Sequence, residues 1–93
     1  MVSEAVRELV GRRRTLEILE LLETAGELNY SAIEQRVDSS SDTVADSLDL
    51  LREHSLVDRY EHHSRDVRYE ITKRGRECLR IIGLLEQLLS QDS

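Results

Sequence analysis

The sequence predicts a mainly α-helical fold with a small β-hairpin. Two observations lead to this prediction. Apolar residues recur every three or four positions in the first part of the chain, in two segments of its middle and again near its end, which is the spacing of amphipathic helices. Before the last of these segments, residues 56–71 include a clear alternation of apolar and charged side chains, typical of a half-buried strand. The expected order of elements is therefore α-α-α-β-β-α.

The first helix is expected within residues 1–24, where Ser3 can cap its start. Gly11 interrupts the apolar pattern and leaves two interpretations open: one helix kinked at Gly11, or a short arm followed by a helix over about 12–24. Gly26 is expected to end the helix. The apolar face of this helix is broad enough to contact more than one neighbour, and it consists of Leu16, Ile18, Leu19, Leu21, Leu22 and Ala25.

Two further helices are expected after a short extended piece at 27–29. The first spans about two turns around Ile33. A serine-rich turn then leads to Ser40, the predicted N-cap of the second helix, which ends near His54. The predicted buried face of the second helix is Val44, Leu48 and Leu51.

A hairpin follows, with strands expected at 56–61 and 67–71. In the second strand Val67, Tyr69 and Ile71 alternate with charged residues, as in a strand with one buried face. The tip between the strands is predicted to consist of His62, His63, Ser64, Arg65 and Asp66.

The last helix is expected to start after a cap at Thr72 and to run to about Leu89. It carries an apolar stripe at heptad-like spacing, with Leu79 and Leu84 beside the stripe. One small domain cannot cover so much apolar surface, so we expect a twofold homodimer through this helix, with the start of the first helix contributing. The predicted dimer interface is Cys78, Ile81, Ile82, Leu85, Leu88 and Leu89.

The 93 residues are expected to form one domain, in which 1–24 hold the first helix, 28–72 the middle helices and the hairpin, and 73–91 the dimerisation helix. Phe and Trp are absent, so the core is aliphatic. The single Cys78 excludes an internal disulfide and favours a cytoplasmic location. We expect no signal peptide, because Glu4, Arg7 and Glu8 interrupt any apolar run at the start. We expect no membrane partner, because no apolar run approaches the roughly 18 residues of a membrane span.

The net charge of −6 argues against a general nucleic-acid coat protein. The charge is unevenly distributed. Residues 27–57 hold seven acidic residues against Arg36 and Arg52, whereas residues 59–93 hold seven basic residues against six acidic ones. Lys73 is the only lysine. This acidic, arginine-rich composition resembles that of halophilic proteins, although a GC-rich genome gives the same arginine bias.

The expected order of elements is the layout of a winged helix-turn-helix, in which one helix enters a DNA groove. Three stretches resemble HxlR-type winged-helix regulators and, more loosely, the MarR and ArsR types. The opening of these regulators resembles GRRRTLEILELLETAGELNYSAIEQRV. Their recognition helix and its exit resemble DTVADSLDLLREHSLVDR, and their return strand and last helix resemble VRYEITKRGRECL. The resemblance covers roughly residues 11–80 and implies a homodimeric transcription factor whose terminal helices pair.

Double-stranded DNA is the expected partner, with the serine-capped helix in the major groove and the hairpin, as a wing, near the minor groove. Hydroxyl groups can bond bases or phosphates, Asp can accept a hydrogen bond from cytosine, and Arg can enter a narrow minor groove. The predicted DNA contacts are Arg36, Ser39, Ser41, Asp42, Thr43, Ala45 and Asp46 in the helix-turn-helix, and His63, Arg65 and Arg68 in the wing.

Three carboxylates of the expected recognition helix, those of Asp42, Asp46 and Asp49, oppose this hypothesis because they repel phosphate. The alternative is an acidic winged-helix module that binds protein and not DNA. The arginine run 12–14 also allows two interpretations, a grip on phosphate or simply a solvated start of the helix.

The sequence shows no combination of nucleophile, base and metal ligands, so we expect neither an enzyme nor a cofactor. His62 and His63 are adjacent and have no further ligand at a metal-binding spacing, so no metal is expected. Cys78 is interpreted as a packing residue and not as a sensor thiol. No small-molecule effector is assigned.

Overall fold

The computed structural model describes residues 1–63 and 66–91. It contains the helices α1 (Glu4–Gly11), α2 (Arg13–Ala25), α3 (Tyr30–Arg36), α4 (Ser41–Glu53) and α5 (Lys73–Ser90). The strands β1 (Glu27–Asn29), β2 (Val57–His63) and β3 (Asp66–Ile71) form an antiparallel sheet in the order β1-β3-β2. The predicted fold class, mainly α-helical with a small hairpin wing, is confirmed. Within the described residues, no helix is both long enough and apolar enough to cross a lipid bilayer.

The expected first helix is two helices, because Arg12 separates α1 from α2 with an extended backbone (φ −103°, ψ 101°). Gly11 is the last residue of α1 and does not kink a continuous helix. The hydroxyl of Ser3 caps α1 by accepting a hydrogen bond from the amide of Val6. Gly26 ends α2 at φ +86°, a left-handed backbone conformation that strains residues with a side chain.

The sheet is larger than the sequence predicted. The extended piece 27–29 is a strand, since β1 pairs with β3 and satisfies backbone groups that would otherwise lie at a free edge. The hairpin is also longer, because His63 of β2 pairs with Asp66 of β3 and neither belongs to the tip. A β-bulge between Glu61 and His63 accommodates this pairing. Residues 64 and 65 of the expected tip lie outside the described residues.

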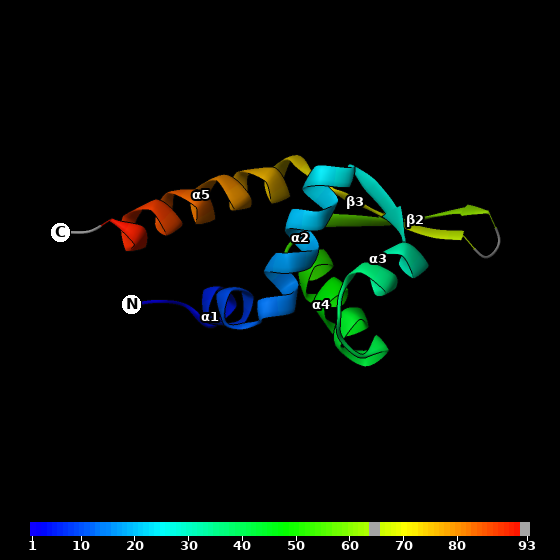
Figure 1. Cartoon of the computed structure of the whole chain (residues 1–93), viewed down its shortest axis with the longest axis horizontal. Helices are drawn as coiled ribbons and strands as arrows, with labels where there is room; N and C mark the ends of the chain where they lie inside the picture. Colours follow the sequence, from blue (N-terminus) through cyan, green and yellow to red (C-terminus); the bar gives the residue numbers. More distant parts are fainter. Residues whose placement is uncertain (64–65, 92–93) are drawn as a thin grey trace.

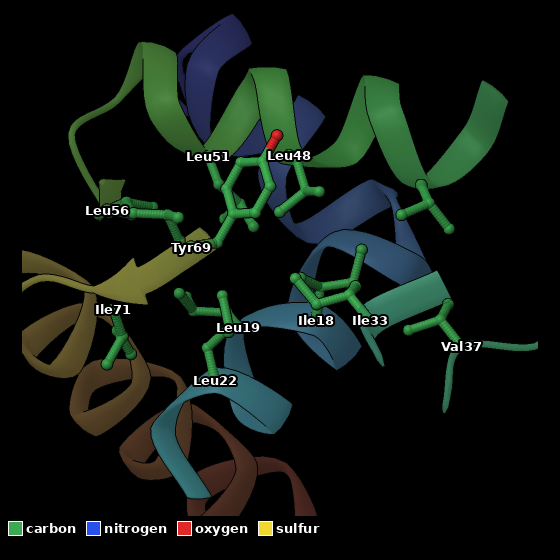
Figure 2. Packing of buried hydrophobic residues seen from close by; sticks show 12 residues of the cluster. Ile18, Leu19, Leu22, Ile33, Val37, Leu48, Leu51, Leu56, Tyr69 and Ile71 are labelled. Carbon is green, nitrogen blue, oxygen red and sulfur yellow. The ribbon is translucent and has the colours of Figure 1, made fainter. Parts of the chain in front are cut away.

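The core is aliphatic and centres on α2. Ile18, Leu19 and Leu22 of α2 have no exposed surface, and α2 contacts α4, α5, β1 and β3. Figure 2 shows their side chains within a cluster to which α3, α4 and the sheet also contribute. The other buried members are Ile33, Val37, Val44, Leu48, Leu51, Leu56, Val57, Tyr69 and Ile71. All three residues of the predicted buried face of α4 belong to this cluster.

Side-chain caps fix the starts of α3, α4 and α5. The side-chain oxygens of Asn29, Ser40 and Thr72 each accept a hydrogen bond from the backbone amide three residues further on, at 2.8, 3.2 and 2.9 Å. The caps predicted at Ser40 and Thr72 are therefore confirmed. Each cap satisfies an amide that the helix itself leaves unpaired, so each defines a helix start.

The molecule is elongated, with extents of 52 × 23 × 22 Å. Figure 1 shows the hairpin of β2 and β3 projecting at one end, and α1 and the free end of α5 projecting at the other end. In the same view α4 and α5 lie on opposite sides of α2. The surface of the helix-turn-helix and the free end of α5 are therefore separate parts of the molecule.

At Gly75 helix α5 lies close to Leu56 and to Ile71 of β3. A Cβ atom at this position would lie 2.3 Å from the carbonyl oxygen of Leu56 and 2.7 Å from Cγ1 of Ile71. We predict that Gly75→Ala lowers the free energy of unfolding by about 1–3 kcal/mol, measured by urea denaturation. Gly83→Ala is the matched control in the same helix. A Cβ there meets nothing within 4 Å, so this change should raise the free energy of unfolding by roughly 0.5–1 kcal/mol. Equal effects of the two substitutions would contradict the close approach.

Candidate nucleic-acid interface

Polar contacts join α3 to the start of α4. The Tyr30 hydroxyl donates to the carbonyl oxygen of Ser41 at 3.1 Å, and the Ser41 hydroxyl donates to the carboxylate of Glu34. The hydroxyl groups of Ser40 and Thr43 share a hydrogen bond of 2.9 Å. The first two contacts help to fix the angle between the two helices, and the third lies within the start of α4. They also engage the hydroxyls of Ser41 and Thr43, so these predicted DNA contacts hold the turn in place in the free protein.

The exposed face of α4 is acidic. Asp42, Asp46 and Asp49 are exposed on it, and Ala45 is half-buried. None of the three carboxylates has an ion-pair partner among the described residues. Arg52, in the last turn, is the basic residue of this helix. Because unpaired carboxylates repel phosphate, this face by itself gives a poor electrostatic match to DNA.

The other predicted contacts of the helix-turn-helix lie close to α4. Arg36 is exposed in the last turn of α3, and Ser39 is half-buried in the turn before α4. In the wing, His63 ends β2, but its side chain lies outside what the structure describes, and Arg65 lies outside the described residues altogether. A DNA contact by any of these four residues stays a prediction.

Arg68 is held in a polar cluster across the sheet. Its Nε donates to Asp66 Oδ2 at 2.9 Å, and its Nη1 donates to Glu27 Oε1 at 3.1 Å. The hydroxyl of Tyr60 donates to the carboxylate of Glu27 as well. Since β3 lies between β1 and β2, this cluster joins all three strands. Two carboxylates thus already compensate the charge of Arg68, which leaves little of it for a phosphate.

The turn between α1 and α2 lies against one flank of α4. Arg12 and Arg14 line a shallow hollow together with Thr43, Asp46 and Ser47 of α4. This placement could not be read from the sequence, where the arginine run and α4 are far apart and no local pattern links them. It follows from the packing of α2 on α4. The structure therefore brings basic side chains beside the acidic helix.

The free end of α5 carries uncovered apolar side chains. The exposed set is Ile81, Leu84, Leu85, Leu88 and Leu89, with exposed fractions of 43–73%. Helix α1 and the residues before it add exposed apolar side chains at Val2, Val6 and Val10. Two members of the predicted dimer interface differ from this set. Cys78 is half-buried against the core, and Ile82 is half-buried facing a groove beside α2.

Cys78 is the single cysteine of the chain. Burial raises the pKa of the Cys78 thiol, which disfavours the reactive thiolate. Within the part of the chain that the structure describes, no three side chains of His, Cys, Asp or Glu are grouped to hold a metal ion.

Comparison with known proteins gives the family. The model of the HxlR-like helix-turn-helix family matches residues 9–92. The chain belongs to the HxlR-like helix-turn-helix family. The predicted resemblance is thus confirmed over nearly the whole chain. No curated protein matches the chain.

Solved structures share the fold of this HxlR-like protein. The reduced form of the transcriptional regulator YodB from B. subtilis has a TM-score of 0.76 and 22% identity, covering 94% of this chain and 90% of that one. Reduced HlyU from Vibrio cholerae has a TM-score of 0.68 and 24% identity, covering 94% and 87%. AF1382 from Archaeoglobus fulgidus has a TM-score of 0.71 and 21% identity, covering 92% and 98%. At identities below 25%, these TM-scores show a common fold.

The contact between Tyr60 and Glu27 should affect the pH at which Tyr60 ionises. The hydrogen bond to Glu27, with smaller contributions from desolvation and from the charges of Glu27 and Glu70, raises the pKa of Tyr60 from 10.0 to about 12. The raised pKa belongs to the folded state. The contribution of this contact to the free energy of unfolding should therefore be complete below about pH 10 and be lost as the pH rises towards 12. We predict that Glu27→Gln lowers the pH at which Tyr60 ionises, followed by tyrosinate absorbance. Tyr60→Phe is the control, since it removes this hydroxyl and keeps Tyr30 and Tyr69. A titration that Glu27→Gln leaves unchanged would count against the contact.

Proposed function

We propose that the protein is a sequence-specific DNA-binding transcriptional regulator that acts as a homodimer, with α4 in the major groove and the β2–β3 wing near the minor groove. One observation carries the proposal: α3 and α4 form a helix-turn-helix, within an HxlR-like chain, in which α4 keeps one whole face exposed. An α-helix presented in this way fits the major groove of B-DNA, which is about 12 Å wide.

The exposed face of α4 supports base recognition more than phosphate binding. The carboxylates of Asp42 and Asp46 can accept hydrogen bonds from cytosine amino groups, and Ala45 can contact a thymine methyl group. The same carboxylates are repelled by acceptor groups at the wrong bases and by phosphate. They therefore lower affinity for every duplex while they increase the difference between right and wrong sites.

Phosphate contacts are proposed for basic residues around this face. Arg36 and Arg52 are exposed at the ends of α3 and α4. In the wing, Arg59 is exposed on β2 and has no ion pair among the described residues, in contrast to Arg68. Arg59 is therefore a better candidate than Arg68 for a contact with the DNA backbone.

A homodimer is proposed from the uncovered apolar surfaces of α1 and α5. Several exposed apolar side chains on one helix mark a site of association, and a small aliphatic core gains stability from it. Figure 1 shows both helices projecting at the end away from the wing. Association there leaves α4 and the wing of each subunit free for DNA, as a twofold regulator requires.

Replacing Leu85 and Leu88 together with Glu should give a folded monomer. Both side chains are largely exposed, 43% and 65%, so charge at these positions disrupts the association and spares the core. Sedimentation at micromolar concentration measures the outcome. Gln87→Glu is the control, because it adds charge to the same exposed part of α5 without removing an apolar side chain. A wild-type protein that sediments as a monomer would rule out the homodimer.

The double substitution Asp42→Asn and Asp46→Asn separates the two candidate functions. It keeps the size of the side chains and removes two charges that repel phosphate, so affinity for random duplex should rise while preference for a selected site falls. The measurement is a titration of random duplex, and of a duplex selected for binding, at two salt concentrations.

The matched control is Glu20→Gln with Glu23→Gln, which removes two exposed charges where α2 faces α5. A similar rise in affinity in this control would assign the effect to total charge. If neither the wild type nor the double variant binds DNA at low salt, the regulator proposal is wrong and the acidic protein-binding module is favoured.

A further inference from the structure

We propose that the turn between α1 and α2 holds a phosphate of the DNA backbone beside α4, with Arg12 as the contacting residue. This inference rests on the proposed function, because the phosphate belongs to the duplex that α4 enters. It adds a contact that lies outside both the helix-turn-helix and the wing. It also gives the acidic recognition helix a local source of phosphate affinity.

The hollow beside α4 has the chemistry of a phosphate contact. Two arginines line it, Arg12 of the α1–α2 turn and Arg14 of α2, together with two hydroxyl-bearing residues of α4, Thr43 and Ser47. Its volume of about 270 Å³ admits a phosphate group. Guanidinium and hydroxyl groups are the donors that proteins most often direct at phosphate oxygens.

The two arginines differ in how far their charge is already compensated. Arg14 Nη1 lies 2.7 Å from Glu17 Oε2, one helical turn further along α2. Arg12 is exposed and has no ion-pair partner among the described residues. Arg12 therefore offers the uncompensated positive charge, and Arg14 is a secondary contributor whose position Glu17 fixes.

The backbone adds to the positive potential at the same place. Helix α2 begins directly after Arg12, and its start has no side-chain cap. The first amides of this helix of 13 residues therefore lack a side-chain acceptor, and they carry the positive end of the helix dipole. The guanidinium of Arg12 and the start of α2 thus favour an anion at the same point.

The position of the hollow on α4 matches the path of a DNA strand. Asp46 is on the exposed face of the helix and Ser47 is almost fully buried, so the hollow that they share lies along the flank between these faces. When a helix lies in the major groove, its outer face meets base edges and its flanks meet the phosphate backbones that wall the groove. A guanidinium on this flank therefore meets a phosphate.

The competing explanation is that Arg12 only offsets the charge of Asp46 within the protein. In that case Arg12 raises affinity for DNA at long range but releases no counterion from a particular phosphate. The two explanations differ in salt dependence, because each phosphate neutralised by direct contact contributes about 0.9 to the slope of log affinity against log salt on B-DNA.

The test compares Arg12→Ala with wild type on random duplex and on a duplex selected for binding, over a series of salt concentrations. We expect affinity to fall by a similar factor on both duplexes and the salt slope to decrease by about 0.9. Arg12→Lys keeps the charge and should keep the slope. Arg76→Ala removes an exposed arginine at the start of α5 and should change neither quantity.

Two results would overturn the inference. One is an unchanged slope for Arg12→Ala, with or without weaker binding, and the other is a loss confined to the selected duplex. Because the side chain of Arg12 makes no capping hydrogen bond, both Arg12 variants should melt like wild type. If the wild-type protein binds neither duplex, both the proposed function and this inference are wrong. If the wild type binds DNA and Arg12→Ala has the same salt slope as the wild type, only this inference is wrong.

Discussion

Burial of one face of α2 holds the other elements of the domain together. Ile18, Leu19 and Leu22 are completely buried, and the helix that carries them contacts α4 on one side and α5 and the sheet on others. Each such side chain contributes about 1.5–3 kcal/mol through removal of its apolar surface from water. In a core without Phe or Trp, most of this burial comes from aliphatic side chains.

This arrangement has an electrostatic consequence for the candidate interface. Because α2 packs along α4, the start of α2 brings Arg12 and Arg14 to the flank of the helix that carries Asp42 and Asp46. The negative net charge of the chain therefore says little about the potential at this surface. The elements that contact DNA in the proposed function combine an acidic face, suited to discrimination, with basic flanks, suited to affinity.

The two ends of the molecule are formed by elements that extend beyond the core. At one end, the polar cluster of Glu27, Tyr60 and Arg68 ties the three strands together at the base of the wing. At the other end, α5 extends beyond the reach of α2 and leaves leucine side chains such as Leu88 in water. Since exposed leucines on a regular helix favour association, the length of α5 links the fold of one chain to its proposed assembly.

The sequence by itself determined the types of most elements, the caps at Ser40 and Thr72 and the buried face of α4, because periodicity and capping are local properties. Only the tertiary structure decided three things: that 27–29 joins the sheet, that Glu27 pairs with Arg68 across 41 residues, and that Arg12 lies beside α4. These contacts join distant segments, and no local pattern encodes them. For the same reason the sequence located the helix-turn-helix correctly but not the charge balance around it.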